Sequence, residues 1–139
     1  MLLVLDTDVV VSAMRSPSGA SAQLLRLART GSISVGVTVA LALEYEAVCL
    51  RDEHIEASGL KLDEVQNFVS AVIAFARPIS VHYRWRPQLR DPADEMVLEA
   101  AVNASADALL TFNIRHFSSA SAAFKLKVCK PGEFLRSLS

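Results

Sequence analysis

The sequence lacks clustered cysteines and long hydrophobic runs, and each absence excludes a class of protein. Cys49 and Cys129 stand alone without metal-type spacing, so we interpret each as a small buried hydrophobic side chain. The longest apolar runs, such as residues 37–43, end well before the ~20 residues that cross a bilayer. A basic start followed by an apolar stretch and a small-residue cleavage site is also absent, which argues against a secretory signal. We therefore expect a cytoplasmic protein without membrane spans.

The sequence also lacks linkers, internal repeats and a strong net charge. With 139 residues, the chain fits one domain over residues 1–139, long enough to bury a core without disulfides or a structural metal. The net charge of −1 says little about partners. Hydrophobic residues make up 52% of the chain, which is rich for a soluble monomer. We therefore expect apolar surface that is shared in a homodimer, a higher oligomer or a complex.

Segments typical of strands alternate with segments typical of helices. Apolar or β-branched runs predict strands at residues 1–5, 33–37, 79–83, 108–112 and 124–129. Helical spacing, caps and prolines predict helices at 20–30, 38–50, 62–76, 92–104 and 131–138, with shorter helices or turns in 7–14 and 51–59 and a loop at 118–121. The alternation predicts an α/β fold of three layers, α/β/α, around a central parallel sheet of four to five strands.

Acidic and amide side chains follow the predicted strands at the edge where the carboxyl ends meet. Asp6 and Asp8 follow the first predicted strand, and Asn113 follows the fourth. Asp94 lies at the start of the helix before the fourth strand, and Glu44 lies on the helix after the second strand. Ligands of open parallel sheets bind at this edge. Close carboxylates would repel by up to ~4 kcal/mol per pair, and a divalent cation removes that repulsion. Oxygen donors without a His or Cys cluster favour Mg²⁺ or Mn²⁺ over Zn²⁺.

Each of these acids also has a purely structural interpretation. Asp8 could cap the helix that follows it, Asp94 could complement a helix dipole, and Glu44 could lie on a solvated helix face. Asp6 is the strongest functional candidate, because an acid directly after apolar strand residues is seldom there for packing.

Four segments, in this order, resemble the PIN-domain family of metal-dependent nucleases, in particular the VapC-like toxins of bacterial and archaeal toxin–antitoxin pairs. The segments are LDTDVVVSA at 5–13, EYEAV at 44–48, RDPADE at 90–95 followed by Ala101, and ADALLTFN at 106–113. Each segment alone is a weak signal, whereas four in order with fitting helices and strands are fairly specific. The resemblance implies a PIN-like fold over nearly the whole chain.

The resemblance implies a Mg²⁺- or Mn²⁺-dependent endoribonuclease that hydrolyses phosphodiester bonds. Asp6, Glu44 and Asp94 take the places of the family's metal-binding acids. Asn113, a further residue expected in the catalytic site, falls where many members have a fourth acid, and its amide contributes no charge. The implied partners are an RNA substrate and a small antitoxin protein. The expected accessory residues are Asp8, Asp91, Glu95, Thr111 and Ser12.

A basic and aromatic segment lies just before the third of these acidic segments. An acidic site repels RNA, so a basic rim must hold the RNA backbone. The candidates are Arg84, Arg86, Arg90 and Arg115, with Trp85 as a base-stacking side chain. Alternatively, this segment is a solvated strand end without a role in RNA binding, and Trp85 covers the core.

Two other functions stay open. Asn113 favours a degenerate PIN domain that binds RNA or protein without cleavage. The Asp6–Thr7–Asp8 start also fits a haloacid-dehalogenase-type phosphatase, with the first Asp as nucleophile. That alternative ranks lower, because Lys61 is the only lysine before the last predicted strand and lies at a helix start.

Overall fold

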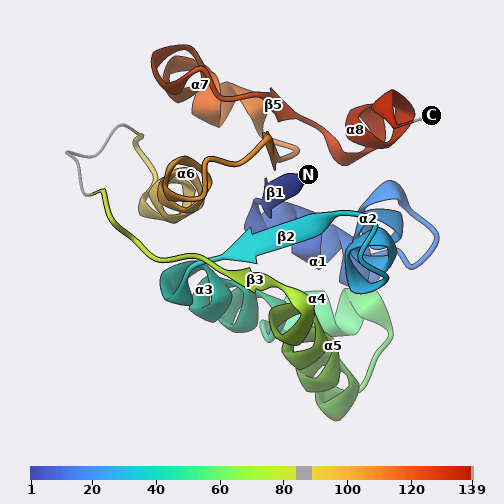
Figure 1. Ribbon diagram of the computed structural model, residues 1–139. Coiled ribbons are helices and arrows are strands. Elements are labelled where there is room, and N and C mark those ends of the chain that lie inside the picture. The colour runs from blue at the N-terminus through green and yellow to red at the C-terminus, as the bar shows by residue number, and fades with distance from the viewer. Residues whose placement is uncertain (84–88, 139) are drawn as a thin grey trace.

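A parallel sheet runs through the centre of the protein. The computed structural model describes residues 1–83 and 89–138, and within them the sheet has five strands in the order β3-β2-β1-β4-β5 (Figure 1). The strands are β1 (Leu2–Leu5), β2 (Ser34–Val37), β3 (Arg77–Pro78), β4 (Ala108–Leu110) and β5 (Val128–Cys129). Every strand pair is parallel, and β1 pairs with β2 on one side and β4 on the other. The first strand of the chain is therefore the central strand of the sheet.

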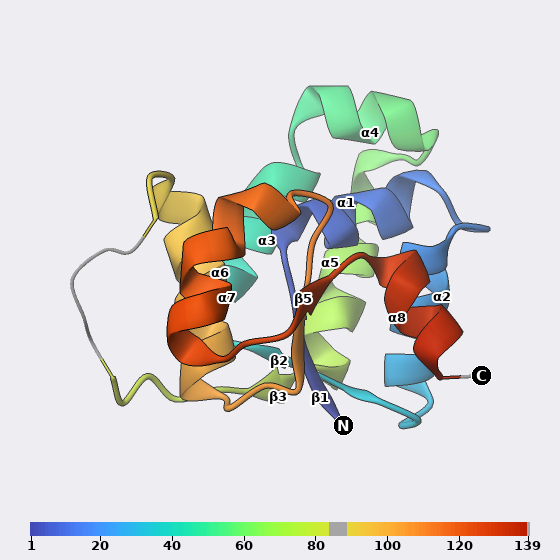
Figure 2. The same ribbon diagram turned by 90° about the horizontal axis from the view of Figure 1, so that it is seen from above.

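Helices flank this sheet on both sides (Figures 1 and 2). Together with the parallel strands, they confirm the predicted three-layer α/β/α architecture. A short 3₁₀ helix, η1 (Ile114–Phe117), precedes α7. The α-helices are α1 (Thr7–Arg15), α2 (Ala20–Arg29), α3 (Val39–Cys49), α4 (Asp52–Ser58), α5 (Leu62–Phe75), α6 (Pro92–Asn103), α7 (Ser118–Phe124) and α8 (Pro131–Ser137).

Capping side chains explain where α3 and α6 begin. Thr38 Oγ1 accepts a hydrogen bond from the backbone N–H of Leu41 at 3.1 Å, and Asp91 Oδ1 accepts one from Ala93 at 2.9 Å. Pro92 adds a residue whose backbone is already set for the first helical turn. These caps fix the starts of the two helices that carry Glu44 and Asp94.

Several predicted boundaries are wrong. The third strand is Arg77–Pro78 rather than 79–83, and proline is tolerated there because β3 is an edge strand. The fourth strand ends at Leu110, two residues early, as the chain turns towards η1. Residues 118–121 belong to α7 rather than to a loop, and Lys125, directly after this helix, adopts a left-handed conformation (φ 52°). The fifth strand therefore starts only at Val128.

Apolar side chains of the central strands form the core of the protein. Leu3, Val4 and Leu5 of β1 have no exposed surface, nor do Leu109 and Leu110 of β4. Burial on both faces of the sheet explains why β1 is a continuous apolar run rather than an alternating one. Both cysteines are buried free thiols, as predicted. Within residues 1–83 and 89–138, no helix is long and apolar enough to span a membrane.

Candidate functional site

Asp6 lies where β1 ends and α1 begins, at the carboxyl edge of the sheet. Its side chain does not cap α1, so the carboxylate is free to meet residues from other elements. Thr111, directly after β4, donates its hydroxyl proton to Asp6 Oδ2 at 2.6 Å. Only 7% of Asp6 is exposed. The pairing of β1 with β4 thus brings together a buried carboxylate and the hydroxyl that orients it.

Asp8 lies inside the first turn of α1 and does not cap that helix. Its Oδ2 accepts two hydrogen bonds, one from the backbone N–H of Phe112 at 3.1 Å and one from Asn113 Nδ2 at 2.9 Å. Its Oδ1 is buried and has no hydrogen-bond partner among the described residues. Asn113 therefore presents its amide N–H to Asp8, and Asp8 ties α1 to the segment after β4.

Asp94 reaches the same edge from the first turn of α6. It is 8% exposed, and its Oδ2 lies 3.0 Å from Nδ1 of His116 in η1. Because a carboxylate oxygen accepts, we assign the proton to Nδ1 of His116. Sequence reasoning missed this contact, since the helix start at residue 92 and η1 are far apart in the chain.

The other predicted acids lie around this group. Glu44, on α3, lines a cleft together with Asp8 and Asp91. Asp91 also caps α6, so its structural role is evident. Glu95 is directed towards the loop before α6, where its carboxylate accepts a hydrogen bond from the backbone N–H of Leu89.

Burial and mutual repulsion disfavour charge on the three inner carboxylates. Burial raises the pKa of Asp6 above its usual value, and the charge of Asp94 raises it further, while the Thr111 hydrogen bond lowers it. Burial, followed by the charge of Asp6, raises the pKa of Asp8 to about 7. Burial also raises the pKa of Asp94, with Asp91 adding to the effect. Carboxylates perturbed in this way are typical of functional sites.

The chemistry of these donors fits a hard divalent cation. Among the described residues, no three His, Cys, Asp or Glu side chains are arranged so that they could hold one ion together. Even so, all the donors are oxygens, Asp6, Asp8 and Asp94 repel one another, and Asp8 Oδ1 is buried without a partner in the described part of the chain. Asp6, Asp8 and Asp94 therefore suit Mg²⁺ or Mn²⁺ by the chemistry of their oxygens but do not surround one point as they are placed here, and Glu44 lines the cleft with Asp8.

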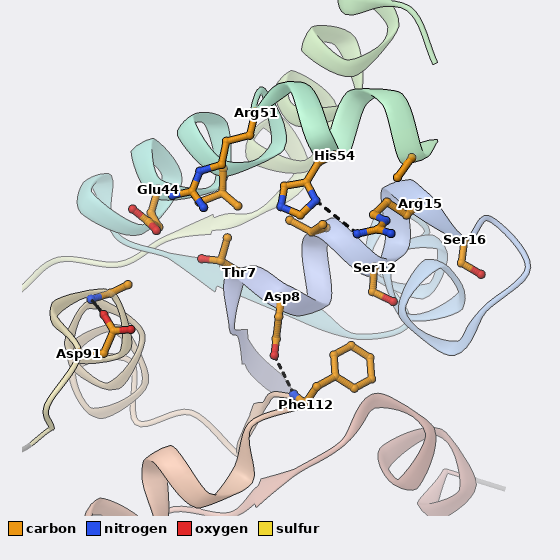
Figure 3. Close-up of a pocket in the computed structure, with 14 residues that line it drawn as sticks. Thr7, Asp8, Ser12, Arg15, Ser16, Glu44, Arg51, His54, Asp91 and Phe112 are labelled. Atoms are coloured by element: carbon orange, nitrogen blue, oxygen red, sulfur yellow. Dashed lines mark hydrogen bonds between the residues drawn. The ribbon is translucent and has the colours of Figure 1, made fainter. Parts of the chain in front are cut away.

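The cleft beside Asp8 has a volume of about 850 Å³ and is lined by side chains of both charges. Asp8, Glu44 and Asp91 contribute carboxylates, and Ser12 contributes a hydroxyl (Figure 3). Three basic side chains also line it, with Arg51 beside Glu44 and His54 next to Arg15, and Phe112 lies at one end. Sequence reasoning missed these four residues, whose only local signal is that Phe112 directly precedes Asn113. They are Arg15, Arg51, His54 and Phe112.

A second cavity, of about 450 Å³, is lined by Asp94. It is lined by Arg90 and Arg115, two of the predicted RNA-binding residues, together with His116. The structure therefore brings these two arginines next to an acid of the site. The predicted residues Arg84, Trp85 and Arg86 lie outside the described residues.

Comparisons with known proteins agree with this architecture. A search of curated proteins finds no significant match. Among solved structures, the chain is similar in fold to one described as the crystal structure of VapBC2 from Rickettsia felis bound to a DNA fragment from their promoter. The TM-score is 0.61 and the identity 14%, over 92% of this chain and 97% of that chain. The model of the PIN domain family matches residues 2–115. This match covers most of the sequence and confirms the resemblance seen in the four segments, so the chain belongs to the PIN domain family.

Proposed function

We propose that the protein is a Mg²⁺- or Mn²⁺-dependent endoribonuclease of the cytoplasm and the toxin of a toxin–antitoxin pair. The observation that carries this proposal is the meeting of Asp6, Asp8 and Asp94 at the carboxyl edge of β1 and β4, beside an open cleft. PIN domains are generally nucleases, and the residues suited to a divalent cation lie where a parallel sheet binds its ligands.

The side chains around the acids prepare them for this role. Asp6, Glu44 and Asp94 would hold the cation, with Asp8 as an additional oxygen donor. Thr111 holds one oxygen of Asp6, and His116 holds one oxygen of Asp94. When bound, the cation lowers the pKa of a water molecule and stabilises charge on the phosphate oxygens. Partners of metal-binding side chains orient those side chains and tune the site, so we assign positioning roles to Thr111 and His116.

Asn113 has a different role from the one that its sequence position suggests. The sequence places it where the family often has an acid, but its Nδ2 donates to Asp8 Oδ2 at 2.9 Å. A donated N–H cannot bind a cation. We therefore propose that Asn113 positions Asp8, and that Asp8 supplies the carboxylate that Asn113 lacks.

The test is cleavage of structured and single-stranded RNAs by the purified chain in Mn²⁺, Mg²⁺ or EDTA. We expect cleavage that needs the metal and is lost in Asp94→Asn. The matched control is Asp63→Asn, which removes an exposed acid of α5 and should leave cleavage unchanged. Cleavage that persists in EDTA or in Asp94→Asn would refute the proposed mechanism.

A degenerate PIN domain that binds RNA without cleavage is the second candidate. It is favoured by the amide at Asn113 and by the absence, among the described residues, of three side chains already grouped around one point. Calorimetry with Mn²⁺ separates the two candidates, because the nuclease must bind the ion and lose affinity in Asp6→Asn. The family assignment leaves no support for the phosphatase alternative.

The proposed partners are a small antitoxin and a second copy of the chain. α3 exposes two large apolar side chains one turn apart, Val39 at 79% and Leu43 at 61%. Such an apolar pair is stabilised by contact with another surface. Light scattering should show a dimer that Leu43→Glu weakens, and a stable monomer at high concentration would contradict this assignment.

A further inference from the structure

Tyr45 is a buried tyrosine that joins two elements of the site without lining the cleft. It follows Glu44 on α3, and none of its surface is exposed. Its hydroxyl donates a hydrogen bond to the backbone oxygen of Leu5. Leu5 is the last residue of β1 and directly precedes Asp6. One hydrogen bond therefore joins the neighbour of Glu44 to the neighbour of Asp6.

This hydrogen bond lies where β1 and β2 separate. The two strands pair up to Leu3 of β1, and the chain leaves the sheet after Val37 of β2 and begins α3. The backbone oxygen of Leu5 lies beyond the paired residues, and the Tyr45 hydroxyl donates to it from α3. A buried backbone oxygen needs such a donor. The tyrosine therefore takes the place of a strand partner at the carboxyl edge of the sheet.

The contacts that hold Asp6 from the other side come from β4 and do not reach α3. The backbone N–H of Asp6 donates to Leu110 at 2.9 Å, and its carboxylate accepts the Thr111 hydroxyl. Glu44 faces the cleft from α3 (Figure 3). This helix also packs against α1, but apolar packing is not directional, whereas a hydrogen bond fixes a distance and a direction. The Tyr45 hydrogen bond thus defines where α3 lies relative to the end of β1.

We propose that Tyr45 is a positioning residue of the site, and that its hydroxyl sets the spacing between the Asp6 and Glu44 carboxylates by tying α3 to the end of β1. The inference rests on the proposed function for the cation that these two acids would hold. Mg²⁺ accepts oxygen ligands only in a narrow range, about 2.0–2.1 Å. A small displacement of α3 would therefore place the Glu44 carboxylate wrongly for an ion that Asp6 binds, although Tyr45 itself touches neither cation nor substrate.

The test begins with Mn²⁺ calorimetry on Tyr45→Phe, which keeps the buried ring and removes the donor. We expect the affinity for Mn²⁺ to fall roughly 10-fold, at the lower end of the loss seen for residues that orient metal-binding side chains. The matched control is Phe134→Leu, which changes a buried aromatic residue of α8, a helix that packs against α2. It perturbs the core away from α3 and should keep the Mn²⁺ affinity of the parent chain.

Two further measurements separate spacing from a general loss of stability. Glu44→Ala removes one of the two carboxylates whose spacing Tyr45 sets. In this background, Tyr45→Phe should change the Mn²⁺ affinity less than about 2-fold, because no spacing is left to lose. The second measurement needs no metal. Residual dipolar couplings recorded by NMR in EDTA should show that α3 has turned relative to β1 in Tyr45→Phe and has kept its orientation in Phe134→Leu.

Three results would overturn the inference: an unchanged orientation of α3 in Tyr45→Phe, an equal loss of Mn²⁺ affinity in Phe134→Leu, or the same effect of Tyr45→Phe with and without the Glu44 carboxylate. Failure of the proposed function looks different. A parent chain that binds no Mn²⁺ would refute the proposed metal site, and the dipolar couplings would then decide the role of Tyr45. A parent chain that binds Mn²⁺ and cleaves RNA, with Tyr45→Phe equal to it in both, would refute the inference alone.

Discussion

Replacing Asp8 with asparagine should stabilise the metal-free protein, although Asp8 belongs to the proposed site. Asparagine has the same shape, and its oxygen can accept the hydrogen bonds that Asp8 Oδ2 accepts from Phe112 and Asn113. What the substitution removes is the cost of a charge that is partly buried and close to Asp6. Functional sites often sacrifice stability in this way.

The size of the effect follows from the pKa of Asp8. In the folded protein this pKa is about 7, against a usual value of 3.8, and the difference of about 3 units corresponds to roughly 4 kcal/mol as an upper limit. Because the side chain is only partly buried, solvent screens part of this energy, and we expect about 1–2 kcal/mol. A raised carboxyl pKa leaves stability intact below pH 4 and reduces it as the pH rises towards 7. The advantage of Asp8→Asn should therefore be absent near pH 4 and complete above pH 7.

Urea denaturation in EDTA at a series of pH values from about 4 to 8 measures this difference, with Asp63→Asn as the control for loss of an exposed acid. The two unfolding curves of the parent and Asp8→Asn should separate as the pH rises. A stability difference that is constant with pH, or an Asp8→Asn protein that is less stable at pH 8, would refute the assignment of a costly charge to Asp8. Either result would also remove the reason to expect a cation there.

Three further substitutions test single contacts. Thr111→Val removes the hydroxyl that holds Asp6 Oδ2 and should weaken Mn²⁺ binding about 10- to 100-fold in calorimetry. Unchanged Mn²⁺ affinity would deny Thr111 an orienting role. Tyr45→Phe leaves the backbone oxygen of Leu5 without the buried hydroxyl that donates to it, so thermal or urea unfolding should show a loss of about 1–3 kcal/mol. Thr38→Ala removes the cap of α3 and should cost about 1 kcal/mol in the same assay; a cost near zero would mean that packing alone sets the start of α3.

Features that depend on residues close together in the chain were predictable from the sequence. The apolar run before Asp6 predicts a strand buried on both faces, and alternating strands and helices allow only a parallel sheet covered by helices. Asp6 and Asn113 follow predicted strands, so their common edge was also predictable. The predicted strand boundaries were wrong where contacts with distant segments set them. Arg77–Pro78, for example, forms a strand because it pairs with β2.

The hydrogen-bond partners of the acids could not be predicted in this way. Asp8 meets Asn113, and Asp94 meets His116, across long stretches of sequence, and no local pattern specifies which donor faces which acceptor. The same holds for the basic side chains of the cleft, since Arg15 and His54 are ordinary helix residues until α1 and α4 pack together.

The sequence by itself thus determined the fold class and the predicted edge of the sheet for the acids, because hydrophobic periodicity and chain order carry this information, and the resemblance of four segments gave the family. Only the tertiary structure decided that Asn113 serves Asp8 and that a cleft joins the acids to two arginines and an exposed phenylalanine. The physical reason is that the direction of a side chain and the pKa of a carboxyl group depend on the atoms packed around them. Those atoms come from segments that only folding brings together.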